Sequence, residues 1–253
     1  MAGFQWAGDL TGAAPVIRTM QVAANCYVGQ LLREDANAGG LVEPIAAAAA
    51  GPDTTSNIIG ICTGVVTSPT WDSTYLGDLA TYDTTQATLV ANDPKGPALV
   101  EVTLLTPTSL IKGPVCKDTL GTAPERKACT TGSSDGLTFV VATIDTTVSN
   151  YSTAYCSKGA NRGQYRKITT GATTTQTVLV PFTYAIATGD TFVIVNIREG
   201  FAHIDFGTQF QSIDSSPALT SYYYAYVHEL NLDLAGKEYA VFSLGSSHLA
   251  IGR

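Results

Sequence analysis

Residues that could carry out catalysis or bind a metal are few in this sequence and lie far apart. In His203-Ile204-Asp205 a histidine and a carboxylate stand two positions apart. In a strand both side chains point to the same face, where they could share a metal ion or a proton. A third ligand would have to come from His228 or His248. Isolated pairs of this kind are typical of surface hydrogen bonds, so we predict no metal site.

Nucleophile and cofactor motifs are also missing from the sequence. Gly245-Ser246-Ser247-His248 lacks the second glycine of a Gly-x-Ser-x-Gly nucleophile elbow. We find no phosphate-binding loop and no dinucleotide fingerprint. We therefore predict a non-enzymatic protein without catalytic residues and without a cofactor. A pair of carboxylates placed for glycoside hydrolysis stays open as an alternative, because a sequence gives no distances in space.

The cysteines favour a reduced core over a metal or disulfide framework. The chain has five, Cys26, Cys62, Cys116, Cys129 and Cys156. They contain no Cys-x-x-Cys pair of the kind that zinc sites use, and their odd number argues against complete pairing. Most lie in apolar runs, such as Ile58 to Cys62, where a thiol behaves as a small hydrophobe. We predict reduced, buried thiols, which fits assembly in a cytoplasm.

Charge limits the classes of partner. The formal net charge is −7, and only 14% of the residues are charged, against roughly 25% in average proteins. Nucleic-acid binding needs clustered cations, so we predict none. One local cluster, Lys158, Arg162, Arg166 and Lys167, could form a basic patch on a hairpin that faces an acidic partner. Solvated charges at strand ends are the alternative.

The sequence shows no membrane signal. Its N-terminus lacks a basic segment followed by an apolar one, and no apolar run approaches the ~18 residues that a spanning helix needs. We expect no secretion signal and no membrane partner.

Tyrosines concentrate near the C-terminus, at Tyr222, Tyr223, Tyr224 and Tyr226. Alternation in a strand sends them to both faces, so one face can fill the core while Tyr223 points outward. Tyrosine has a large apolar body and a hydrogen-bonding tip, and it is enriched in protein interfaces. A sheet buried on both sides is one alternative. A carbohydrate-binding groove is another, because aromatic faces stack on sugar rings.

The elements that must position these residues are β-strands. Residues 222–234 alternate with period two, and Ala98 to Leu105 places Val100, Val102 and Leu104 on one face. Glycines and asparagines mark the turns, and no segment has a convincing period of 3.6. The patterns predict an all-β fold of two antiparallel β-sandwich or β-barrel-like lobes with extended terminal arms.

Composition suggests where the lobes begin and end. Residues 1–15 are rich in glycine and alanine and indicate an extended N-terminal arm. The stretch Thr130 to Gly136 has the composition of a linker, which predicts an N-terminal β domain over 16–135 and a C-terminal β domain with a tail over 136–253. Apolar residues of the arms, Phe4, Trp6, Leu249 and Ile251, need a partner to bury them or pack back onto their own domain.

One segment resembles a known class of proteins. The run from Gly159 to Ile197 combines Gly163-Gln164-Tyr165-Arg166, Pro181 and Gly189-Asp190-Thr191-Phe192. It resembles a segment of tailed-phage virion proteins, among them capsid decoration (cement) proteins. Gly29 to Ile61 is similar to the strand-and-turn style of small decoration proteins.

The resemblance implies a structural protein at the capsid surface of a virion, made in the host cytoplasm. It would bind the outer surface of the major capsid protein lattice, stabilise the shell, and associate with itself as a dimer or trimer. The interface residues that we predict are Phe4, Trp6, Arg162, Tyr165, Arg166, Tyr223, Leu249 and Ile251. A tail or fibre protein and a carbohydrate-binding or adhesin module are the alternatives.

Overall fold

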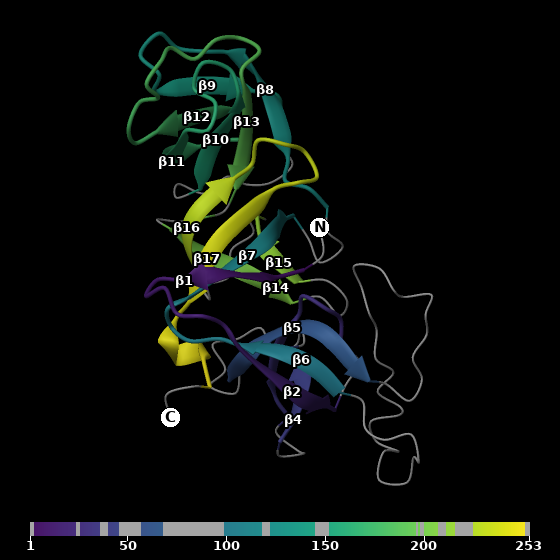
Figure 1. Ribbon diagram of the computed structural model, residues 1–253. Helices are drawn as coiled ribbons and strands as arrows, with labels where there is room; N and C mark the ends of the chain where they lie inside the picture. The colour runs from purple at the N-terminus through teal and green to yellow at the C-terminus, as the bar shows by residue number, and fades with distance from the viewer. Residues whose placement is uncertain are drawn as a thin grey trace. The chain divides into compact units, whose positions relative to one another are not determined.

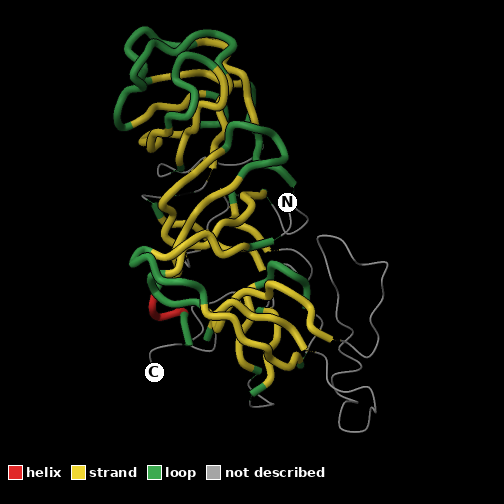
Figure 2. Tube along the Cα trace, viewed as in Figure 1, coloured by secondary structure: helices red, strands yellow, loops and turns green. Residues whose placement is uncertain are grey.

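The computed structural model describes residues 3–23, 26–35, 40–45, 57–67, 99–117, 122–144, 152–195, 197, 200–206, 211–215 and 225–250 (Figures 1 and 2). Within these ranges the chain forms 17 strands and one 3-10 helix, Ser246–His248. The all-β prediction with two barrel-like lobes is confirmed, since the described strands form two closed barrels. Short β-branched runs favour strands, and ten glycines with positive φ angles allow tight turns between them.

The chain divides into two compact units that are discontinuous in sequence. The first comprises Met1–Gly113, Asp205–Ser212 and Val241–Arg253, and the second comprises Pro114–Ile204 and Ile213–Ala240. The stretch that predicted a linker is instead the turn between two paired strands of the second unit, in which Cys129 faces Val141. A Cβ on Gly132 would lie 1.9 Å from the carbonyl oxygen of Ile186, so this glycine is packed directly against backbone. The expected boundary near residue 135 therefore falls inside the second unit.

A closed barrel of five strands forms the centre of the first unit. Its order is β2-β4-β3-β5-β6, and its strands are β2 (Val16–Val22), β3 (Leu31–Glu34), β4 (Leu41–Pro44), β5 (Ile58–Thr67) and β6 (Leu99–Leu104). All pairs are antiparallel except β2–β4. As the alternation predicts, Val100 and Val102 are buried while Glu101 is exposed. Their burial fills the barrel from β6.

The N-terminal segment belongs to the first unit from residue 3 onward. Strand β1 (Gln5–Asp9) pairs with β7 (Ser109–Cys116), and the ring of Phe4 lies edge-on to Phe242 with ring centroids 5.4 Å apart. A Cβ on Gly113 would lie 2.2 Å from the Phe4 ring, so the missing side chain makes room for it. The predicted arm is thus held by apolar burial and by backbone pairing.

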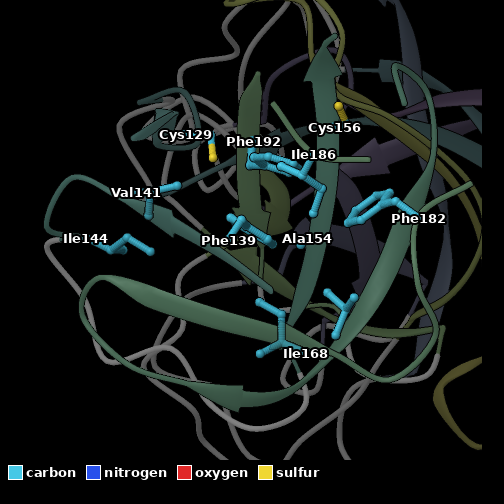
Figure 3. Packing of buried hydrophobic residues seen from close by; sticks show 11 residues of the cluster. Cys129, Phe139, Val141, Ile144, Ala154, Cys156, Ile168, Phe182, Ile186 and Phe192 are labelled. Atoms are coloured by element: carbon cyan, nitrogen blue, oxygen red, sulfur yellow. The ribbon is translucent and has the colours of Figure 1, made fainter. Parts of the chain in front are cut away.

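A closed barrel of six strands forms the second unit's core (Figure 1). Its order is β10-β11-β12-β9-β8-β13, and its strands are β8 (Arg126–Thr131), β9 (Thr138–Val141), β10 (Thr153–Lys158), β11 (Tyr165–Gly171), β12 (Thr175–Val178) and β13 (Thr191–Val195). The described pairs are antiparallel. Phe139 and Phe192 stack at 4.0 Å between centroids, and Phe182 lies 5.5 Å from Phe192. Figure 3 shows these rings together with the aliphatic side chains of the same cluster.

The remaining strands form a six-stranded sheet of order β1-β7-β15-β14-β16-β17. Its further members are β14 (Phe201–Phe206), β15 (Gln211–Asp214), β16 (Ala225–Asn231) and β17 (Tyr239–Leu244). Within the second unit, β14 pairs antiparallel with β16 through Phe201 opposite Tyr226 and Ala202 opposite Ala225. Both alanines are buried and both aromatic residues are exposed, which places an aromatic pair on the outer face.

Candidate binding surfaces of the second unit

Polar side chains of the β10–β11 turn hold the loop that follows β12. Asn161 is fully buried, its amide nitrogen donates to the carbonyl oxygen of Tyr184 at 2.9 Å, and its Oδ1 accepts from Tyr184 N at 2.9 Å. Gln164 Oε1 accepts from the backbone N–H of Thr183 at 3.2 Å and from its hydroxyl at 2.9 Å. Bonds to both backbone groups of one residue and to its neighbour leave the loop little freedom.

Arg166 completes this attachment. Its Nε donates to the carbonyl oxygen of Pro181 at 3.0 Å, its Nη2 donates to Gln164 Oε1 at 2.9 Å, and its Nη1 donates to the carbonyl oxygen of Tyr165 at 2.8 Å. The guanidinium carbon lies 5.2 Å from the centre of the Phe182 ring, within cation–π range. The Gly163-to-Arg166 motif therefore performs an internal task in the barrel, and Arg166 is committed to it.

The Gly189-Asp190 turn packs closely against Gly159. Gly159 has φ +122°, and a Cβ there would lie 2.1 Å from Asp190 Oδ1. Asp190 is buried, and its Oδ2 accepts from Ala187 N at 3.0 Å. Only glycine gives the backbone this conformation and this proximity without strain. The spacing from Gly159 to Asp190 is thus explained by the packing of two turns.

The loop held in this way presents apolar side chains to solvent. Leu179, Val180 and Tyr184 are 58%, 54% and 58% exposed, and we call them the apolar loop. Their backbone is fixed by the bonds to Asn161, and by Leu179 N donating to the Lys167 carbonyl oxygen at 2.8 Å. A rigid loop that exposes three large apolar side chains is suited to binding another surface.

The connection from β16 to β17 is anchored to the barrel by Asp233. Its Oδ1 accepts from the Tyr155 hydroxyl at 2.9 Å, and its Oδ2 accepts from Arg162 Nη2 at 2.9 Å. Arg126 Nη2 adds bonds to the Leu232 carbonyl oxygen and to Glu238 Oε1, both at 2.6 Å. Burial, and then the bond to the Asp233 carboxylate, raise the pKa of Tyr155 to about 12. These contacts hold the end of β16 to β8, to β10 and to the turn between β10 and β11.

A pocket of about 420 Å³ lies between β16 and the barrel strands β10 and β11. We call it the aromatic pocket. Its lining residues are Thr153, Tyr165, Lys167, Ile197, Gly200, Tyr226, Val227, His228, Glu229 and Leu230. Its volume lies within the range of about 300–1,000 Å³ that is usual for small-molecule sites. All of its lining residues belong to the second unit.

Tyr165 and Tyr226 line this pocket, and Phe201 lies against Tyr226 without being one of the lining residues. Tyr165 is 56% exposed, and Phe201 and Tyr226 are each 46% exposed. The Tyr226 ring lies edge-on to Phe201, with centroids 5.4 Å apart, and to His228, with centroids 5.0 Å apart. A Cβ on Gly200 would lie 3.1 Å from the Tyr226 ring, so glycine lets this ring settle against the backbone.

Among the predicted interface residues, two are exposed at the surface of the second unit and two are buried. Tyr165 lines the aromatic pocket, and Arg162 is bound to Asp233 while remaining largely exposed. Phe4 and Leu249 are buried at 1% and 3%, because Phe4 packs in the core and Leu249 forms a bridge to Ile58. Neither is available to a partner.

Other predicted positions complete this comparison. Trp6 lines a hollow of about 230 Å³ in the first unit with Pro15 and Leu104 among its neighbours. Tyr223 and Ile251 lie outside the described residues. Of the basic cluster, Arg162 pairs with Asp233, Arg166 donates to the Pro181 carbonyl oxygen, and Lys167 lines the aromatic pocket. The predicted basic patch stays a prediction.

Two features of the aromatic pocket were not predicted from the sequence, namely Lys167 as a lining residue and the outward-facing Tyr226, whose side of the strand was expected to fill the core. The exposed Phe201 opposite Tyr226 was not predicted either. A usable signal was present. In both Phe201-Ala202 and Ala225-Tyr226 an aromatic residue adjoins a small one, and in a strand only one of the two can face inward. The buried alanines leave room for close packing while the rings face outward.

The histidine of the His203-Ile204-Asp205 pair and the five cysteines are buried. His203 is buried in β14, and among the described residues no group of three or more His, Cys, Asp or Glu side chains is placed to hold a metal ion. All five cysteines are buried free thiols, as predicted. The Sγ atoms of Cys26 and Cys62 lie 3.7 Å apart, and burial raises the pKa of Cys156 to about 11. Neutral buried thiols are poor nucleophiles.

Comparison with protein-family models, curated proteins and solved structures finds no match to this chain. No helix among the described residues is long and apolar enough to cross a membrane.

Proposed function

We propose that this chain is a non-enzymatic decoration (cement) protein of a tailed-phage capsid. It binds the outer surface of the major capsid protein lattice and stabilises the shell by adhesion. The observation that carries the proposal is the apolar loop, whose exposed Leu179, Val180 and Tyr184 side chains are mounted on a fixed backbone. The resemblance of the surrounding segment to virion proteins points to the same class of partner.

The physical reason is preorganisation. A flexible loop loses conformational entropy when it binds, whereas a loop already held by Asn161, Gln164 and Arg166 loses little. Apolar side chains and tyrosine supply the contact area that anchors interfaces. The contact needs no cofactor.

The first unit also exposes large apolar side chains that could contact a shell. Leu10, Val16 and Ile17 are exposed at the end of β1 and the start of β2. Two surfaces on one chain strengthen attachment, because binding of the first raises the effective concentration of the second. A protein of this kind can bridge neighbouring shell subunits, and a closed dimer or trimer would match local symmetry axes of a shell.

Copy number tests the proposal directly. Quantitative mass spectrometry of purified particles should find this chain at an abundance approaching that of the major shell protein. A few copies per particle would assign it to the tail or fibres instead. Absence from the particles would refute a virion role.

A binding experiment then tests the apolar loop. Shells lacking this chain are mixed with purified full-length protein, and bound protein is measured after sedimentation. We expect Leu179→Ser and Val180→Ser to weaken binding by about tenfold or more, as loss of an interface anchor does. Leu234→Ser is the control, because Leu234 is equally exposed in the same unit but lies outside the apolar loop. Equal effects of all three substitutions would contradict this assignment.

A further inference from the structure

The aromatic pocket is a second surface with different chemistry from the apolar loop. None of the three apolar-loop residues lines it. Tyr165 comes from β11, and Tyr226 comes from β16 with Phe201 directly opposite it on β14. Rings from two strands, Tyr165 and Tyr226, thus line one hollow, and the Phe201 ring lies edge-on to Tyr226; each of the three has about half of its surface open to solvent. An accessible ring beside a preformed hollow is able to stack on a flat ligand.

Polar groups in the same hollow supply both donors and acceptors. Thr153 Oγ1 donates to the Ile197 carbonyl oxygen at 2.7 Å, which leaves its lone pairs available to accept. Glu229 Oε1 accepts from the Tyr239 hydroxyl at 2.8 Å, which orients the carboxylate. Lys167 adds a cationic donor. One lysine and one glutamate leave the formal charge of the lining balanced.

We propose that the aromatic pocket binds a neutral saccharide unit of a glycan. A pyranose has a face of C–H groups with slight positive charge, which suits the negative face of a tyrosine ring, and an edge of hydroxyls that both donate and accept. The lining combines these two features around a volume fit for a small ring. This binding goes beyond adhesion to a shell and does not depend on it.

Other ligand classes fit the lining less well. A quaternary ammonium group prefers an aromatic cage without a cation, and here Lys167 lines the pocket. A phosphate or polyanionic ligand requires clustered cations, whereas Glu229 contributes a negative charge. A neutral ring with hydroxyls is repelled neither by the charge of Lys167 nor by that of Glu229.

The pocket is also preorganised. The Asp233 contacts with Tyr155 and Arg162 fix the end of β16, and Gly200 lets Tyr226 lie close to the backbone. Held walls reduce the entropy lost on binding a small ligand. Rigid placement of rings from separate strands is what a weak, stacking-based ligand requires.

The test uses full-length protein on an array of neutral oligosaccharides of glucose, galactose, mannose and N-acetylglucosamine, with uronic-acid and sialylated glycans as acidic arms. Binders are then titrated by calorimetry. We expect a neutral oligosaccharide to bind. Tyr165→Ala and Tyr226→Ala should each weaken its binding by about tenfold, as loss of an aromatic anchor does. Tyr226→Phe should retain most of it, because the stacking face remains.

Tyr184→Ala is the matched control, since Tyr184 is equally exposed in the same unit but lies in the apolar loop. The proposal would be overturned if no neutral glycan bound with a Kd of about 1 mM or tighter, which corresponds to a binding free energy of about −4 kcal/mol. Binding to acidic glycans alone, or binding unchanged by both tyrosine substitutions, would overturn it as well. Shell binding is measured separately, so either proposal can fail without the other.

Discussion

Replacing Gly159 by alanine should destabilise the second barrel through two separable effects. At φ +122° an alanine backbone is strained by about 1–3 kcal/mol. The new Cβ would also lie 2.1 Å from Asp190 Oδ1, so the buried carboxylate has to move. Moving it endangers the bond from Ala187 N, and a hydrogen bond to a charged group contributes about 1.5–3 kcal/mol. Together the free energy of unfolding should fall by about 3–5 kcal/mol.

Gly163→Ala separates the two effects. Gly163 lies in the same turn at φ +82°, and a Cβ there meets no atom within 4 Å. It should therefore cost only the backbone strain of about 1–2 kcal/mol. The remaining difference from Gly159→Ala reports the approach to Asp190. In the double variant Gly159→Ala with Asp190→Ala the clash is gone. Its loss in free energy of unfolding should therefore be smaller than the sum of the losses of the two single variants.

The assay must report on the second unit alone. The chain has two tryptophans, Trp6 and Trp71, and neither lies in the second unit's segments, so fluorescence is a poor probe of it. Urea unfolding followed by far-ultraviolet circular dichroism gives the total loss. Hydrogen exchange of peptides within 153–195 localises that loss to the barrel. Equal losses for the two glycine variants, or additivity in the double variant, would refute the account of Gly159 and Asp190.

Three further predictions concern other parts of the fold. Phe192→Ala should cost about 3–5 kcal/mol in urea unfolding, because it removes the ring at the centre of the second core, and a loss under 1 kcal/mol would contradict that placement. Because the pKa of Tyr155 is raised to about 12 from 10.0, its contribution to stability is complete below pH 10 and disappears as the pH rises toward 12. Asp233→Ala should lower the pKa of the Tyr155 ring in an NMR titration while burial keeps it above 10, and an unchanged value would show that Asp233 has no influence. Bonds from Thr11 and then Thr108 lower the pKa of Asp9 to about 2 from 3.8, so the stability difference between wild type and Asp9→Ala should be full above pH 4 and vanish toward pH 2, as followed by denaturation midpoints.

Strand positions followed from local pattern. The alternation of Val100 and Val102 with Glu101 predicted β6, and the period of two around Tyr226 predicted β16. At β6 the pattern also predicted which face is buried, whereas at β16 the face that carries Tyr226 and His228 was expected to fill the core and is exposed. All-β architecture could therefore be predicted with no knowledge of the pairing.

Barrel closure and the limits of the units could not be predicted in the same way. The stretch from Thr130 to Gly136 has the same composition whether it is a linker or a hairpin turn, and only the pairing of Cys129 with Val141 decides between them. Likewise, Phe4 is buried because Gly113 and Phe242 meet it from distant parts of the sequence. Such contacts leave no trace in a local pattern.

Several polar residues and glycines of the Gly159–Ile197 run make internal contacts. Asn161, Gln164 and Arg166 bind the 181–184 backbone, and Gly159 accommodates Asp190. A pattern of this kind therefore specifies a barrel with a rigid loop. Under the proposed function, specificity for the shell lies in the side chains that this loop displays, Leu179 and Val180 foremost, since both are exposed. Exchanging these two residues should change what the protein binds while leaving its stability intact, whereas exchanging Asn161 should weaken both.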